Sequence, residues 1–210
     1  MLVREATFTV DLGENGYLIG FDDDYAWPEE MPFGWRCGPA TDANAVVIPT
    51  TDTGPVQMTV QIHDGPPAAE TGGDWEPAEE VSLRADFPAL CLAVIRQSDF
   101  WDAWPEHEPP LEIPPSAGGG DWVRMRLYCH VDNLEPGVGD RDERHLVQLW
   151  RSPQAPGVHP EITEADRQAR ADYAAQMGML VEEYTTTYPS TYTPDSPAGM
   201  TPAPPWRRPV

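Results

Sequence analysis

The sequence predicts an all-β fold: an antiparallel β-sandwich over residues 1–153, followed by a C-terminal helix and an extended tail rich in Pro and Thr. Short segments up to about residue 151 alternate polar and apolar residues, which is the pattern of half-buried strands. Pro and Gly fill the connections, and no helical period separates the strands, so parallel βαβ units are not expected. A length of 210 residues suits one domain with an appendage.

About eight strands are expected. The first spans residues 7–12, and Asn15 and Gly16 separate it from a second at 17–21. An Asn-Gly pair between two such runs predicts a β-hairpin, because both residues tolerate the positive φ of tight turns. The other strands are expected at 46–48, 56–62, 79–87, 91–95, 122–131 and 145–150.

Alternation also predicts which side chains face the core. The run 122–131 places Arg124, Arg126, Tyr128 and His130 together on one face, with apolar residues on the other. Apolar positions of the central strands should therefore be buried. These predicted core residues are Val60, Ile62, Leu83, Leu92, Val94, Val123, Leu127, Val147 and Leu149.

The chain changes character after residue 153. Residues 154–184 are expected to form a linker and an amphipathic helix, with Thr163 as the N-cap and apolar residues spaced three or four apart. Residues 185–210 contain seven Pro and six Thr without a hydrophobic period, which predicts an extended tail. Three connections, at 22–44, 64–78 and 99–121, are longer than connections in compact domains usually are.

Charge is the strongest compositional signal. The chain has 35 acidic residues and 13 basic ones, all of them Arg, for a formal net charge of −22. Residues 1–110 alone hold 21 acidic residues and four Arg, a net −17. This balance argues against binding to nucleic acid or to an anionic membrane, and it favours a basic protein partner.

Two segments that mix aromatic and acidic residues are the candidate partner-binding sites. Both lie in long connections, and Trp side chains contribute strongly to interface energy. The competing interpretations are a solvated acidic loop and aromatic residues that pack over an open end of the sandwich. The candidates are Asp22, Asp23, Asp24, Trp27, Glu29, Glu30, Trp101, Asp102, Trp104 and Glu106.

No catalytic residue, metal or cofactor is expected. His130, Asp132 and His145 resemble the ligand pattern of metal-dependent β-barrel enzymes, but His-x-Asp pairs often arise by chance. Glycine-rich phosphate loops and nucleophile motifs do not occur in the sequence. Three Cys give no disulfide framework, and neither a signal-peptide core nor an apolar span is present, so a cytoplasmic location is expected.

Residues 56–153 carry a family resemblance. A Glu-Glu-Val-Ser-Leu strand at 79–83, the long strand from Trp122 and a last strand ending at Leu149 and Trp150 near Pro153 follow one another. This order resembles the competence-protein-J-like group of small β proteins, in its actinobacterial type, and the absence of Lys suits a high-GC genome. The resemblance implies a small β fold, and the founding member of the group inhibits a nuclease. The segment after residue 155 departs from the pattern.

Together these features favour a non-enzymatic acidic binding protein, an inhibitor or immunity protein for a basic enzyme such as a nuclease. The first alternative is a structural subunit that self-associates through its C-terminal helix and tail. The second is a metal-dependent β-barrel enzyme.

Overall fold

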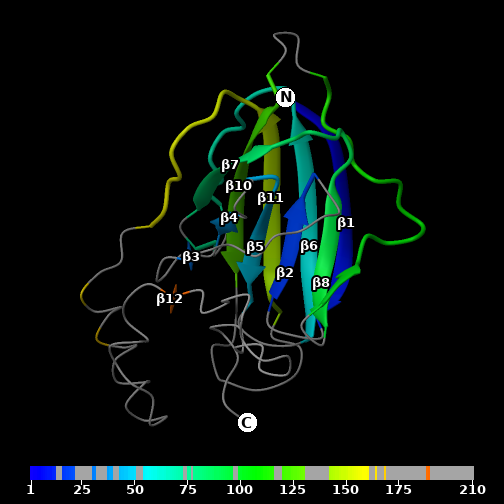
Figure 1. The fold of residues 1–210 in the computed structure, drawn as a ribbon, viewed down its shortest axis with the longest axis vertical. Coiled ribbons are helices and arrows are strands. Elements are labelled where there is room, and N and C mark those ends of the chain that lie inside the picture. Colours follow the sequence, from blue (N-terminus) through cyan, green and yellow to red (C-terminus); the bar gives the residue numbers. More distant parts are fainter. Residues whose placement is uncertain are drawn as a thin grey trace, which may run out of the picture.

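The protein is mostly β-structure in the computed structural model. The described residues are 1–12, 16–21, 30–31, 37–39, 43–50, 54–72, 75–76, 78–96, 99–115, 120–130, 142–160, 164, 168 and 188–189. Within them the chain forms two five-stranded sheets, which face each other as two layers (Figure 1). A two-stranded pair, β3 (Glu30–Met31) with β12 (Tyr188–Pro189), is separate from both sheets.

The first sheet is mixed. Its strands lie in the order β1 (Leu2–Leu12), β6 (Gly54–His63), β11 (Arg144–Arg151), β10 (Trp122–His130) and β7 (Glu79–Arg84). All neighbours are antiparallel except β6 and β11, which run parallel with Val147 opposite Val60. The prediction of a purely antiparallel sandwich is therefore wrong for this pair. The mixed sheet therefore contains two antiparallel pairs, β1–β6 and β10–β11, which are joined by the parallel pairing of β6 with β11.

The second sheet is antiparallel throughout. Its order is β4 (Gly38–Pro39), β5 (Ala45–Pro49), β2 (Gly16–Gly20), β8 (Cys91–Arg96) and β9 (Asp99–Asp102). The short strands β4 and β9 were not predicted, because Pro in one and acidic residues in the other gave them the composition of loops.

The predicted hairpin between residues 7–12 and 17–21 does not form. β1 pairs with β6 in the mixed sheet, whereas β2 pairs with β5 and β8 in the second sheet. The chain therefore crosses between the layers after Leu12. The burial of β2 explains the difference: all five of its residues are buried, which suits a central strand between apolar neighbours rather than a hairpin partner of the half-exposed β1.

One hydrophobic core fills the space between the sheets. It includes Phe8 and Met58 from the mixed sheet and Ile19 and Ile48 from the second. All nine predicted core residues are at most 2% exposed, so the predicted strand faces are confirmed. A smaller apolar cluster of Leu18, Ala45 and Val47 lies on the opposite face of the second sheet and is also fully buried.

The C-terminal predictions fall mainly outside the described residues. Of the predicted helix 163–184 only Glu164 and Gln168 are described, and both have helical backbone. In the tail, Tyr188 and Pro189 pair with Met31 and Glu30 of the same chain. No helix in the described part of the chain is long and apolar enough to cross a membrane.

Gly20 provides a test of how closely β2 approaches β5. A Cβ at this position would lie 2.5 Å from the Asn44 carbonyl oxygen and 2.6 Å from the Ala45 Cα, and backbone atoms cannot yield cheaply. Gly20→Ala should therefore lower the free energy of unfolding by about 1–3 kcal/mol, measured by urea denaturation. The matched control is Gly65→Ala, which meets no atom within 4 Å and should change stability by less than about 0.5 kcal/mol. Equal effects of the two substitutions would contradict the close approach.

Candidate functional site: the open side of the sandwich

The two sides of the sandwich differ in how their edge strands are covered. β7 and β4 end the sheets on one side, and β1 and β9 end them on the other. On the first side, residues 152–159 follow β11 and run along the edge of β7. Val158 and Glu80 exchange two backbone hydrogen bonds of 2.8 Å, and the Ala155 N–H donates to the Ser82 hydroxyl at 3.0 Å. We refer to residues 152–159 as the strap.

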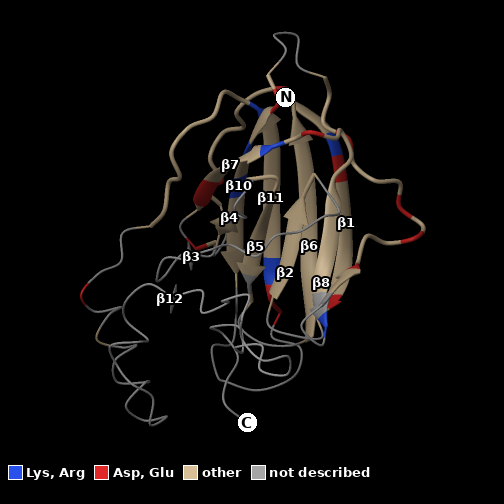
Figure 2. Ribbon diagram, viewed as in Figure 1, with Lys and Arg blue, Asp and Glu red and all other residues tan. Residues whose placement is uncertain are grey.

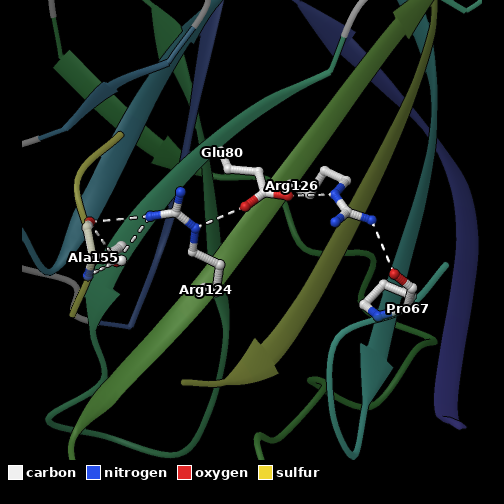
Figure 3. A network of polar contacts seen from close by, with 6 residues as sticks. Pro67, Glu80, Arg124, Arg126 and Ala155 are labelled. Carbon is white, nitrogen blue, oxygen red and sulfur yellow. Dashed lines mark hydrogen bonds and ion pairs between the residues drawn. The ribbon is translucent and has the colours of Figure 1, made fainter. Parts of the chain in front are cut away.

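Two arginines and one glutamate fasten the strap and a loop to the outer face of the mixed sheet (Figure 3). Nε of Arg124 and Nε of Arg126 donate to opposite oxygens of the Glu80 carboxylate, at 3.0 and 2.7 Å. A further guanidinium nitrogen of Arg124 donates to the Ala155 carbonyl in the strap at 3.1 Å, and one of Arg126 donates to the Pro67 carbonyl at 3.2 Å. Both arginines therefore serve internal structure.

The predicted polar face of β10 is confirmed, but it is covered. Arg124, Tyr128 and His130 are at most 5% exposed. The Tyr128 hydroxyl accepts a hydrogen bond from the Glu70 N–H at 2.9 Å, and the Trp75 ring packs against both Tyr128 and His130. This face is not available to a partner.

Burial and charge act in opposite directions on Glu80. Burial by itself raises the pKa of this carboxyl, but the hydrogen bonds and positive charges of Arg124 and Arg126 outweigh it and hold the pKa below its usual value. The network is therefore expected to keep Glu80 ionised through mildly acidic conditions.

A second polar cluster lies between the sheets. His145 on β11 accepts or shares a hydrogen bond with the Tyr17 hydroxyl on β2 at 2.8 Å, and its other ring nitrogen lies 3.0 Å from Glu143 Oε1. Cys129 is the cross-strand neighbour of His145 in β10. Burial lowers the pKa of His145, but the Cys129 sulfur and the Glu143 carboxylate raise it, with a net value of about 9. This cluster links the two sheets, and its four members are at most 4% exposed, too buried to serve as a surface site.

The two histidines of the alternative metal-site interpretation point in different directions. Cys129 is paired with His145, and His130 with Arg144, so His130 and His145 lie on opposite faces of the mixed sheet and cannot bind one ion together. Asp132 lies outside the described residues. In the part of the chain that the structure describes, no group of three His, Cys, Asp or Glu is placed to hold a metal ion.

On the open side, the two predicted tryptophans have different roles. Trp104 packs its ring against Phe8 of β1 with centroids 5.2 Å apart, and its indole N–H donates to the Glu108 carbonyl at 3.0 Å. It closes the gap between the two sheets. Trp101, on the edge strand β9, is 55% exposed. An exposed Trp on an edge strand is a strong candidate for a partner contact.

Exposed acidic residues lie on both edge strands of the open side and on the loop after β9; Figure 2 colours the acidic positions red. Glu5 and Asp11 are exposed on β1, Asp102 is exposed on β9, and Glu106 is exposed on the loop. Asp11, Asp102 and Glu106 form no ion pair with another described residue. The arginines of β7 and β10, by contrast, pair with carboxylates on the covered side, including Arg84 with Asp86 at 2.7 Å. We refer to Glu5, Asp11, Trp101, Asp102 and Glu106 as the open-side patch.

The structure describes part of the predicted partner-binding set. Asp22, Asp23, Asp24, Trp27 and Glu29 lie outside the described residues, and Glu30 is placed only by its backbone in β3. Trp101 and Asp102 lie on opposite faces of β9, Glu106 follows on the loop, and the Trp104 N–H donates to Asp102 Oδ1 at 3.0 Å. Sequence reasoning predicted the strand at 7–12 but did not include its outer face in the site, although the polar residues at positions 5, 7, 9 and 11 alternate with buried ones.

Comparisons with known proteins give two distant structural likenesses. No protein-family model and no curated protein matches the chain. The crystal structure of ComJ, inhibitor of the DNA degrading activity of NucA, from Bacillus subtilis, has a TM-score of 0.47 at 7% identity and covers 72% of this chain and 99% of that chain. A structure described as crocagin biosynthetic gene J has a TM-score of 0.39 at 16% identity, covering 70% and 98%. Both are weak likenesses of fold, and the case for function rests on this chain's own residues.

Removing the charge of Glu80 should loosen the strap. Glu80→Gln leaves two guanidinium groups, 6% and 14% exposed, without their carboxylate, and should lower the free energy of unfolding by about 2–4 kcal/mol at pH 7. Since the pKa of Glu80 is depressed in the fold, this stabilisation is present above the unfolded-state pKa and is lost as the pH falls through the folded-state pKa. The free energies of unfolding of the wild type and the variant should therefore become equal at acidic pH, as measured by acid denaturation. The exposed pair Arg84–Asp86 supplies the control: Asp86→Asn should cost at most about 1 kcal/mol.

His145 predicts a loss of stability at alkaline pH. Its pKa is about 9 in the fold against 6.5 for a free imidazole, so its contribution is complete below pH 6.5 and is lost as the pH rises through 9. Urea denaturation between pH 6.5 and 9.5 should show a fall of about 1–3 kcal/mol. Glu143→Gln removes the carboxylate that helps to raise the pKa of His145 and should flatten the curve. A wild-type stability that stays constant over this range would contradict the assignment.

Proposed function

We propose that this chain is a non-enzymatic acidic binding protein that captures a basic protein through the open-side patch. The observation that carries the proposal is Trp101: it is 55% exposed on an edge strand, in a segment that also exposes the carboxylates of Asp102 and Glu106. Trp is among the residues that supply most of the binding energy at protein interfaces.

The net charge supports the same proposal through kinetics. A formal charge of −22, of which −17 lies in residues 1–110, attracts a cationic partner over distances longer than direct contacts. Such steering raises the association rate more than it slows dissociation, whereas an aromatic anchor acts mainly on dissociation. Net charge and Trp101 are therefore expected to affect different rates: charge the association rate and Trp101 the dissociation rate.

The finer form of the proposal is an inhibitor or immunity protein for a basic enzyme such as a nuclease. A nuclease offers a cationic groove to the phosphates of its substrate, and an acidic protein surface is complementary to the same groove. Occupying the groove would block catalysis without any chemistry in the inhibitor. The acidic segment at 22–30 remains a predicted second contact.

The proposal predicts that the partner, captured from the native host and identified by mass spectrometry, is a basic protein. Its association rate with the chain should fall steeply between 0.1 M and 1 M salt, as the Debye length shrinks from about 10 Å to about 3 Å. Asp102→Lys/Glu106→Lys should slow association. Trp101→Ala should speed dissociation, with Kd raised about 30-fold for a loss of about 2 kcal/mol.

The control is Glu70→Lys, a charge reversal at an exposed residue on the covered face. It should leave both rates nearly unchanged beyond the general effect of net charge. A complex that is insensitive to salt and survives changes at Trp101 and Asp102, but is lost when residues 185–210 are deleted, would overturn the proposal and favour the structural-subunit alternative.

A further inference from the structure

The edge of β1 is the longest free backbone on the open side. β1 spans 11 residues and ends the mixed sheet, and residues Arg4–Leu12 pair with β6 in unbroken register. Among the described residues, the backbone of β1 hydrogen-bonds only to β6, and the Met1 carbonyl just before it accepts from the Asp64 N–H. Along its other edge, N–H and C=O groups point away from the sheet at every second residue. The neighbouring edge strand β9 has only four residues.

The side chains of β1 alternate strictly in burial. Ala6, Phe8, Val10 and Leu12 face the core and are at most 9% exposed. The residues between them, Glu5, Thr7, Thr9 and Asp11, are exposed on the outer face. Two of these are already held by neighbours on β6: the Gln61 amide donates to Glu5 at 2.7 Å, and the Thr7 and Thr59 hydroxyls lie 3.1 Å apart. The outer face is therefore an ordered row with a carboxylate at each end.

We infer that β1 binds its partner by strand addition: an extended segment of the basic partner pairs with the free edge of β1 and becomes a sixth strand of the mixed sheet. The inference rests on the proposed function and specifies its binding mode. Backbone hydrogen bonds to an exposed edge supply affinity in such complexes, and alternate side chains supply specificity.

The row on β1 defines the chemistry of the incoming segment. Cross-strand neighbours lie about 5 Å apart, so Glu5 and Asp11 each select a Lys or Arg opposite them, and these two positions are six residues apart. The residues opposite Thr7 and Thr9 are small and polar. The alternate residues face the gap that Trp104 closes against Phe8, and are therefore apolar.

The same acidic residues make a second copy of this chain a poor occupant of the edge. Charged side chains on an edge strand are a common means of preventing self-pairing. Two copies would bring together two molecules that each carry a charge of −22. A basic segment instead gains opposite-charge pairs at both ends of the row. Charge complementarity therefore selects the foreign basic strand.

The test uses the full chain and a capped peptide, Lys-Val-Thr-Val-Thr-Val-Lys, which reads the same in both directions and so fits a parallel or an antiparallel approach. Amide hydrogen exchange by NMR should show that the peptide slows exchange at alternate residues of β1 between positions 5 and 11. A peptide with the same side chains but N-methylated backbone should give no protection, because it cannot complete the hydrogen-bond ladder.

Charge exchange supplies the specificity control. Glu5→Lys/Asp11→Lys should weaken binding of the Lys peptide about tenfold and should create binding to the peptide Glu-Val-Thr-Val-Thr-Val-Glu. Glu70→Lys should do neither. Protection of β1 amides that is absent with the N-methylated peptide, together with this exchange of preference, supports strand addition.

Two results would overturn strand addition. One is equal binding of the N-methylated peptide, and the other is protection confined to residues outside β1. Neither result would contradict the proposed function. That proposal is tested by how the association rate with the whole partner changes with salt and by the effects of substituting Trp101 and Asp102. Conversely, the proposed function would be wrong if the affinity for the whole partner did not change with salt or with substitution of Trp101 and Asp102. This holds for either result with the peptide.

Discussion

The crossing of the chain between the layers after Leu12 determines where this molecule has a free edge. Because β2 enters the second sheet, β1 keeps β6 as its one described strand neighbour and remains at the end of the mixed sheet. The parallel pairing of β11 with β6 then extends that sheet only in the other direction, toward β10 and β7. Had β2 folded back onto β1, both edges of β1 would be occupied. One crossing thus separates a closed side from an open side.

The distribution of the arginines reinforces this asymmetry. Arg124 and Arg126 are held by Glu80 and by carbonyls of the strap and loop, and Arg151 donates to the Pro114 carbonyl at 3.1 Å. These cations stabilise internal contacts, so they do little to neutralise the surface. The carboxylates of Asp11, Asp102 and Glu106 on the open side, by contrast, are exposed to solvent. The negative potential on the open side therefore follows from the use of the arginines in internal contacts on the covered side.

Alternation in the sequence was sufficient to predict the longer strands of the two sheets and their buried faces, because burial of every second residue is a local property. It could not assign strands to sheets: the pattern around Asn15 and Gly16 suits a hairpin or a crossing equally, and only the burial of β2 on both faces decides. The candidate site was partly predictable. Trp101 and Trp104 are equivalent in sequence, but the contact of Trp104 with Phe8 is a long-range feature that no local pattern encodes.

An exposed edge strand carries a risk of self-association, and the way in which a protein limits that risk also restricts what it can bind. Here the limiting devices are Glu5 and Asp11 on the outer face of β1, a register shift between Leu2 and Arg4, and a net charge of −22. Each disfavours a second copy of the chain, but the carboxylates and the net charge favour a strand that carries Lys or Arg. Protection against self-pairing and selection of a basic partner therefore follow from the same residues, so specificity at this edge needs no additional recognition element.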